Sequence, residues 1–375
     1  MINLIEKGDM IYRKLQEQLD TLPIGFPKTK SGVEIRLLKF FFTPKEAEIA
    51  INMRLIPEPV KKIYRRVKKK VESIEELELI LDRMYQKGAI NLKRLMDENG
   101  EERQYYLAFL AVGMYEYQVK SITKEFYEDL EQYFEEEYID EFISTKINQL
   151  RTIPVEESIT PEHNISTYDE LRTIIERTEK ISVMDCICQK GKDLIGESCK
   201  QTNMREHCFA LNNSAQHVVD INNGRFITKD EALNILKKAQ EEGLILQPGN
   251  AQDPNFICCC CGCCCDLITN LKKLERPWEM FYSNYYANVD SDSCIGCETC
   301  LNRCQMDAIS MVENIAVVKQ NLCIGCGNCV ITCPEQAITL KRKDKEMLPP
   351  KTTTDLYLKI MDKKAELRRT EKGTT

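Results

Sequence analysis

The sequence lacks the features that would place it in a membrane or among nucleotide-dependent enzymes. It contains no uncharged apolar stretch of the roughly 18 residues that a membrane-spanning helix needs, and its amino terminus has no basic flank followed by an apolar core. No glycine-rich nucleotide-binding fingerprint occurs, so neither flavin nor NAD is suggested. We therefore expect a cytoplasmic protein with no membrane span.

Acidic residues outnumber basic residues in this sequence. The 375 residues include 52 Lys and Arg against 59 Asp and Glu, which gives a net charge of −7. Non-specific nucleic-acid binding depends on neutralising phosphates with Lys and Arg, so the overall charge argues against nucleic acid as a partner. The length and a hydrophobic content of 43% indicate two or three folded domains, with the oligomeric state left open.

Cysteine is absent from the first 150 residues and abundant later. The chain contains 19 cysteines, and fifteen of them lie within residues 258–333. An odd number cannot all be paired in disulfides. In a chain without an export signal, such a concentration indicates metal ligation.

The amino-terminal region reads as mostly helical. Capping residues and a proline predict helices that begin at Pro44 and after Ser73, with a further helix over residues 58–70 between them. A β-hairpin is predicted around the turn dipeptide Asn99-Gly100. Three helices followed by a hairpin resemble the winged-helix domains of transcription regulators.

In the winged-helix family the third helix would enter the major groove. Here that helix is acidic, with Glu75, Glu76, Glu78 and Asp82, and such a face repels phosphate. A basic run over residues 61–70 lies on the preceding helix. It is either a solvated face or a docking site for nucleic acid or an acidic protein.

The next region opens with a helix capped at Thr167, and it then presents four cysteines. Cys186 and Cys188 follow an apolar run, and residues two apart in an extended strand face the same side, so both can face one metal. Cys199 and Cys208 would complete the set from later loops. Four thiolates suit either a tetrahedral zinc or a cubane cluster, and buried free cysteine is the alternative.

A second cysteine group is denser, with seven thiols in eight residues. Its members are Cys258, Cys259, Cys260, Cys261, Cys263, Cys264 and Cys265. No mononuclear site can use seven ligands, and at most alternate members can share a face. The possibilities are a third iron–sulfur cluster shared with the earlier four cysteines, an unusual polynuclear cluster, zinc, or a thiol–disulfide site. A nitrogen ligand from His207 would raise a cluster's reduction potential, although such a histidine is more often a polar or core residue.

Residues 294–333 contain the pattern C-x2-C-x2-C-x3-C twice, offset by 29 residues. The first copy is Cys294, Cys297, Cys300 and Cys304, and the second is Cys323, Cys326, Cys329 and Cys333. An internal repeat this short implies two similar halves packed together. Two [4Fe–4S] clusters fit this pattern far better than a pair of four-thiolate zinc sites.

This segment resembles the bacterial two-cluster ferredoxins, in which the fourth cysteine of each run binds the other cluster. The resemblance implies two ligand sets. They are Cys294, Cys297, Cys300 and Cys333 for one cluster, and Cys323, Cys326, Cys329 and Cys304 for the other. One departure is Gln305, which follows Cys304 where the family has a proline such as Pro334. The loss of that proline frees a backbone donor near a sulfur and can shift one cluster's potential.

The sequence thus predicts an α+β multidomain protein. The expected domains are a helical, winged-helix-like region (1–150), a cysteine-rich α+β domain (151–283), a two-cluster ferredoxin domain (284–342) and a basic tail with a terminal helix (343–375). This order resembles a group of iron–sulfur proteins found in anaerobes.

We expect an electron-transfer protein that relays single electrons between its two [4Fe–4S] clusters and the cysteine-rich centre, with a redox protein as partner. An oxidoreductase subunit whose middle centre reduces a substrate and a redox-sensing winged-helix regulator are the alternatives. Whether the chain is itself an enzyme is left open.

Overall fold

The structure of the chain, a computed structural model, describes residues 9–97, 100–159 and 169–373. It divides into two compact units, of which the first comprises residues 1–142 and 217–223 and the second residues 143–216 and 224–375. Both units mix helices with small sheets, which confirms the α+β class in its coarse form. The predicted domain limits at residues 150, 283 and 342 stay predictions.

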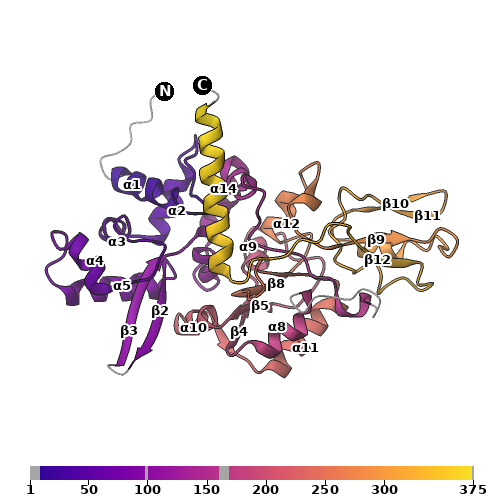
Figure 1. Cartoon of the computed structure of the whole chain (residues 1–375), viewed down its shortest axis with the longest axis horizontal. Coiled ribbons are helices and arrows are strands. Elements are labelled where there is room, and N and C mark those ends of the chain that lie inside the picture. Colours follow the sequence, from indigo (N-terminus) through magenta and orange to yellow (C-terminus); the bar gives the residue numbers. More distant parts are fainter. Residues whose placement is uncertain (1–8, 98–99, 160–168, 374–375) are drawn as a thin grey trace. The chain divides into compact units, whose positions relative to one another are not determined.

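The first unit is mostly helical, with one three-stranded antiparallel sheet of order β1-β3-β2 (Figure 1). Its helices are α1 (Asp9–Leu19), α2 (Val33–Phe41), α3 (Pro44–Ala50), α4 (Val60–Val67), α5 (Ile74–Gln86), α6 (Lys124–Tyr133) and α7 (Ile139–Ile143). Its strands are β1 (Glu58–Pro59), β2 (Ile90–Asp97) and β3 (Gly100–Leu107).

Local capping sets the helix starts in this unit. The Thr43 side chain accepts a hydrogen bond from the Glu46 backbone, and the Glu46 carboxylate accepts one from Thr43 at 2.8 Å. Ser73 accepts from the Glu76 backbone at 3.1 Å. Each cap satisfies backbone donors that the first turn leaves unpaired, and these caps confirm both predicted helix starts.

The hairpin and the second helix differ in detail from their predictions. Strands β2 and β3 pair in register over their full length, as predicted, while Asn99 of the predicted turn lies outside the described residues. The helix predicted over 58–70 is α4, which is shorter because Glu58 and Pro59 pair with β3 instead. The predicted hairpin thereby becomes a three-stranded sheet.

Residues 217–223 pack with the first unit through an aromatic contact. The His217 ring lies between Tyr85 and Tyr117, with centroid separations of 4.2 and 4.1 Å. Burial lowers the pKa of His217 to about 3, so the ring is neutral at ordinary pH. Asp220 accepts a hydrogen bond from the Tyr85 hydroxyl at 2.7 Å and pairs with Arg94 at 2.7 Å. His217 is therefore a packing residue of this unit.

The second unit is built around a five-stranded antiparallel sheet of order β6-β4-β5-β8-β7. Its strands are β4 (Ile181–Asp185), β5 (Glu206–Leu211), β6 (Gly224–Phe226), β7 (Ile245–Pro248) and β8 (Phe256–Cys260). The accompanying helices are α8 (Leu171–Arg177), α9 (Ile187–Leu194), α11 (Lys229–Glu241) and α12 (Asp266–Leu271), while α10 (Asn213–Asp220) begins in this unit and ends in the first. The predicted cap at Thr167 lies outside the described residues.

The two faces of this sheet differ in character. Helices α8 and α11 lie side by side (Figure 1), and their apolar residues share a buried core with Val183, Phe209 and Ile257. The residues that alternate with these core positions include Cys208 and Cys258. Because successive strand residues point to opposite faces, one face is apolar and the other carries cysteines.

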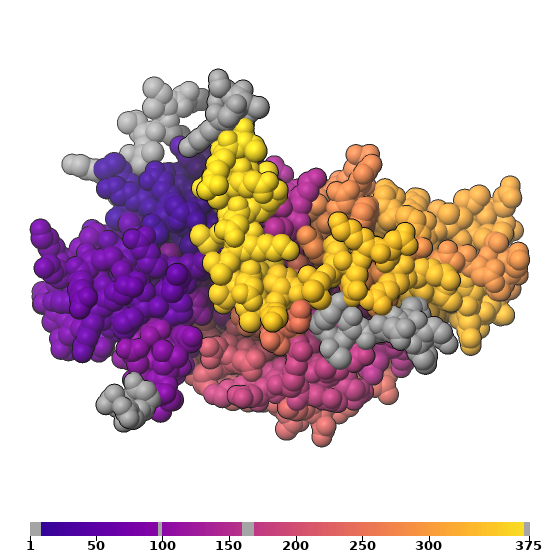
Figure 2. Space-filling model, viewed as in Figure 1, coloured from indigo at the N-terminus to yellow at the C-terminus, as the bar shows by residue number. Residues whose placement is uncertain are grey.

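The rest of the second unit follows the cysteine run. Its strands form two antiparallel pairs, β9 (Tyr285–Val289) with β12 (Ile338–Arg342) and β10 (Ile309–Val312) with β11 (Ile315–Val318). A short helix, α13 (Thr299–Arg303), lies between β9 and β10 in sequence. The predicted terminal helix is α14 (Thr353–Gly373), which runs along the surface (Figure 2, yellow) and buries Leu356 and Ile360. Among the described residues, no helix combines the length and apolarity needed to cross a membrane.

Candidate iron–sulfur centres

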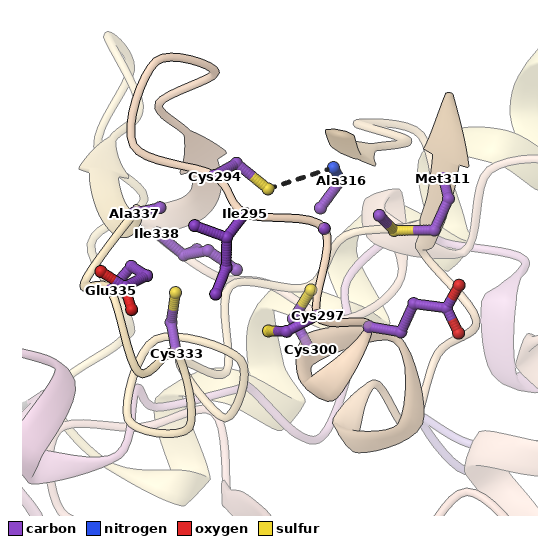
Figure 3. A pocket seen from close by; sticks show the side chains of 12 residues that line it. Cys294, Ile295, Cys297, Cys300, Met311, Ala316, Cys333, Glu335, Ala337 and Ile338 are labelled. Atoms are coloured by element: carbon purple, nitrogen blue, oxygen red, sulfur yellow. Dashed lines mark hydrogen bonds between the residues drawn. The ribbon is translucent and has the colours of Figure 1, made fainter. Parts of the chain in front are cut away.

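The first cysteine set lies around one small cavity. Cys294, Cys297 and Cys300 come from the first repeat and Cys333 from the second, and all four line this cavity. Figure 3 shows their side chains directed into a common space, beside apolar residues such as Ile338. The grouping across repeats is the one that the ferredoxin resemblance implies, and the donor set could hold a [4Fe–4S] cluster.

The loops between these cysteines require glycine. Gly296 and Gly325 occupy the same place in each repeat, with φ of +69° and +65°. A Cβ at Gly296 would lie 2.3 Å from the Asn314 carbonyl oxygen, and one at Gly325 would lie 2.2 Å from that of Tyr285. Only glycine fits both the left-handed backbone and the close approach, so each loop is folded tightly around its cysteines.

The second cysteine set comprises Cys304, Cys323, Cys326 and Cys329. The thiol charges of Cys304 and Cys323 act on Cys326, and all three act on Cys329. Burial raises the pKa of Cys326 to about 12 and also raises that of Cys329. Cys323 and Cys329 are buried and Cys304 and Cys326 are half-buried. Thiols in such a place that must lose protons to bind metal fit a cationic cofactor, because unpaired thiolates would be costly there.

Backbone N–H groups approach the sulfurs of both sets. Ala316 donates to Cys294 at 3.5 Å in the first set. In the second set Ala308 donates to Cys304 at 3.3 Å and Ala287 to Cys323 at 3.4 Å. Hydrogen bonds of this kind stabilise negative charge on sulfur and tune a bound cluster's potential.

The two sets differ in the charged side chains around them. Glu298 and Glu335 line the first cavity. The charges of Arg303 and Lys343 act on Cys326 and Cys323 of the second set. Burial lowers the pKa of Arg303 and of Lys343. Because the ordinary pKa of either side chain lies far above neutral pH, both remain cations. The first set is therefore lined by two acidic residues, whereas the second set lies near two basic residues and one acidic residue, Asp307, which acts on Cys304.

The second set also lies against the cysteine-rich domain. The Val155 N–H donates to the Cys326 carbonyl at 2.9 Å, and the Asn328 side chain donates to the Gly243 carbonyl at 2.9 Å. A Cβ at Gly327 would lie 2.2 Å from the Ser158 hydroxyl. This loop is thus packed directly on the cysteine-rich domain.

Gln305, the departure from the ferredoxin pattern, makes a further link. Its side-chain oxygen accepts a hydrogen bond from the Gly262 N–H at 2.8 Å, and only 9% of the residue is exposed. A Cβ at Gly262 would lie 2.3 Å from the Gln305 carbonyl oxygen. The residue that follows Cys304 therefore touches the middle of the dense cysteine run, a role that its sequence position alone did not indicate.

The dense cysteine run divides between two groups. One group consists of Cys199, Cys261, Cys263 and Cys264, whose sulfurs all lie within 4.8 Å of one another. Cys199 is 3.7 Å from both Cys261 and Cys263, and Cys263 is 3.5 Å from Cys261. Contacts with the other three thiols lower the pKa of Cys199. These four residues form a compact candidate metal site.

The other group is a closed ring of six thiols, in which the pKa of each thiol is shifted by its two neighbours. In order around the ring they are Cys186, Cys188, Cys265, Cys260, Cys258 and Cys208. Contact with the Cys208 thiol lowers the pKa of Cys258 to about 5. The ring draws on strands β5 and β8 and on the residues that precede or open helices α9 and α12.

Two expectations from the sequence need correction here. Cys199 was grouped with Cys186, Cys188 and Cys208, but its sulfur lies with Cys261, Cys263 and Cys264. Cys186 and Cys188 were expected on one extended strand, yet β4 ends at Asp185 and Cys186 caps helix α9. The two thiols still meet, because the strand-to-helix turn brings them together.

Cys259 belongs to neither group. It is 1% exposed and packs in the apolar core with Phe209 and Ile257, on the opposite face of β8 from Cys258 and Cys260. Burial raises its pKa well above the ordinary value. It behaves as a small apolar core residue.

Comparison with known families covers the carboxy-terminal region. Residues 287–340 match a family model described as a 4Fe-4S dicluster domain, and residues 322–365 match a second model with the same description. No curated protein and no solved structure matches the chain. The first match spans both cysteine repeats, so residues 287–340 form a ferredoxin-like iron–sulfur domain.

Proposed function

We propose that the chain is an electron-transfer protein that carries single electrons between an outside redox partner and its cysteine-rich domain. The first set (Cys294, Cys297, Cys300, Cys333) and the second set (Cys304, Cys323, Cys326, Cys329) would each hold a [4Fe–4S] cluster. When bound, these clusters supply one-electron redox chemistry. The proposal rests on where the two sets lie. Cys297 of the first set is exposed, whereas the Cys326 loop of the second set is packed on the cysteine-rich domain.

The charges around the two sets favour inward electron flow. A reduced cluster carries one more negative charge, so nearby cations stabilise it and nearby anions oppose it. Lys343 and Arg303 act on the second set, whereas Glu335 acts on Cys297 of the first set. The second set would therefore have the higher potential, and electrons that arrive at the first set would move toward the cysteine-rich domain.

Gln305 and Gly262 provide a direct link onward. Cys304 is adjacent to Gln305 in the chain, and Gly262 lies between Cys261 and Cys263 of the compact four-cysteine group. The 2.8 Å hydrogen bond from Gly262 to Gln305 therefore joins the two metal-binding regions through a few bonds. We infer that this contact positions the cysteine-rich domain as the electron acceptor.

The surface around the first set suits a protein partner. Ile295 is 64% exposed beside the exposed Cys297, and the acidic residues Glu298 and Glu335 line the same cavity. An exposed apolar side chain with an acidic rim fits a redox protein that presents basic residues around its own centre. Transient electron-transfer contacts of this kind are usually small.

We also propose that residues 43–109 are a winged-helix unit used for protein contact. The order of its helices and its β1-β3-β2 sheet support this assignment. Arg83 of α5 and Lys87, its C-cap residue, are both paired with Glu46, which leaves the helix without free cations for phosphate. This pairing weakens the alternative of a DNA-binding redox regulator.

The proposal is tested by removing a ligand of the first set and following the reduction of the cysteine-rich domain. In anaerobically purified Cys297→Ala protein, a small redox protein should reduce the cysteine-rich domain at least tenfold more slowly than in the unaltered chain. Dithionite, which needs no docking surface, should still reduce it. Equal rates with the protein reductant would refute the relay.

A further inference from the structure

The two cysteine groups of the middle domain differ in how far apart their sulfurs lie. In the compact group four of the six sulfur–sulfur pairs lie 3.5–3.7 Å apart, and all six lie within 4.8 Å. A single tetrahedral ion with metal–sulfur bonds of about 2.3 Å places its four sulfurs about 3.8 Å apart. A cubane cluster inserts several metal and sulfide atoms between its thiolates and holds them further apart. The compact group therefore has the spacing of a mononuclear site.

The cysteines of the dicluster domain provide an internal comparison. All eight are described, yet no three of them bring their sulfurs within 4.8 Å of one another. They belong to the region that matches the 4Fe-4S dicluster family. The same structure thus spaces cluster-binding cysteines widely and the Cys199 group narrowly, which indicates a difference in the kind of metal centre.

We propose that the six-thiol ring holds one polynuclear iron–sulfur centre, separate from a mononuclear metal site in the compact group. Six thiolates exceed the four positions of a tetrahedral ion, so a ring of this size must be shared among several metals. Three of its members, Cys186, Cys208 and Cys265, are buried. Neutralising so many buried thiolates requires the concentrated positive charge of a metal cluster.

The ring is not explained by packing. Cys208 and Cys258 are direct partners across β5 and β8, and Cys260 lies two residues further along the same face. The opposite face of these strands uses Phe209, Ile257 and other apolar residues for the core. If the cysteine face served only to fill space, branched apolar side chains would pack there better.

His207 adds an unpartnered ligand to the same place. The residue is 1% exposed, and one of its ring nitrogens lies within 4.8 Å of the Cys186 and Cys208 sulfurs. Its Nε2 contacts the Gln189 side chain at 3.1 Å, while Nδ1 is buried with no hydrogen-bond partner among the described residues. A buried, unsatisfied nitrogen beside the ring fits a group that bonds to a metal or to a cluster sulfur.

The two centres would be direct neighbours. Cys260 and Cys265 of the ring are adjacent in the chain to Cys261 and Cys264 of the compact group. The contacts that begin at Gln305 therefore lead first to the compact group and then to the ring. The choice of iron for this centre rests on the proposed function, whereas the separation into two centres rests on the geometry alone.

Three alanine variants of neighbouring cysteines test the inference. In full-length protein purified anaerobically, Cys260→Ala should lose at least two irons and at least two acid-labile sulfides per chain. Cys263→Ala should lose no more than one metal ion and no sulfide. Cys259→Ala is the matched control, since its side chain packs in the apolar core on the opposite face of β8 from Cys258 and Cys260, and it should lose neither.

Cys188→Ala and Cys199→Ala serve as second variants of the ring and the compact group. The electron paramagnetic resonance (EPR) signals of the reduced dicluster domain verify that each protein is folded. The inference is overturned if the ring variants lose no sulfide, if zinc replaces iron in the ring, or if Cys260→Ala and Cys263→Ala remove the same metals. Failure of electron relay would leave these metal counts unchanged, so the two proposals fail separately.

Discussion

Lys343 offers a direct test of how the chain sets the potential of the second cluster. Its ammonium lies 4.9 Å from the centre of the Trp278 ring and is buried without a hydrogen-bond partner among the described residues. The charge acts on Cys323. For an effective dielectric constant of about 20 and an assumed charge-to-cluster separation of about 10 Å, one unit charge contributes about 1.7 kcal/mol. That energy corresponds to about 70 mV for a one-electron couple, since a tenfold change is 59 mV.

We therefore expect Lys343→Met to lower the reduction potential of the second cluster by some tens of millivolts. The potential of the first cluster should not change, and Lys343→Arg, which keeps the charge, should shift neither. Redox titration followed by EPR measures both potentials. An unchanged or raised second potential would refute the charge argument.

Three further predictions follow. Gln305→Ala removes the acceptor of the Gly262 N–H and should slow reduction of the cysteine-rich domain in stopped-flow experiments without loss of dicluster iron; an unchanged rate would contradict the link. Gly296→Ala places a Cβ 2.3 Å from the Asn314 carbonyl and should lose about four irons, whereas Gly32→Ala, also at positive φ but with nothing within 4 Å, should lose none. His217, with a folded pKa of about 3, binds its proton only on unfolding, so stability should fall by about 1.6 kcal/mol between pH 6.5 and 5. Denaturant titrations of His217→Phe should show a smaller fall, and an equal fall would exclude this histidine as its cause.

The features that the sequence predicted well are those encoded locally. The caps at Thr43 and Ser73 act within four residues, so a single stretch of sequence determines where each helix starts. The two four-cysteine runs repeat at short spacing with glycines at matching places, and the family comparison supports them. Alternation along β8 likewise follows from strand geometry, and it separates Cys259 from its neighbours.

The features that the sequence did not reveal depend on contacts between distant segments. Cys199 reaches Cys261 across 62 residues, and no local pattern indicates that partner. His217 belongs to a short segment that packs with tyrosines far earlier in the chain. The sequence shows only that Gln305 replaces a proline of the ferredoxin pattern. Its hydrogen bond with Gly262 joins segments that are far apart in sequence and forms only in the folded protein.

The most direct test of the relay is the order in which the centres are reduced. The full-length protein would be mixed anaerobically with a reduced redox protein and frozen at successive times for EPR. If electrons pass through the dicluster domain, its EPR signal rises first and then declines as the signal of the cysteine-rich domain grows. The relay is contradicted if the cysteine-rich domain is reduced first. It is also contradicted if the dicluster domain stays reduced and the cysteine-rich domain is never reduced.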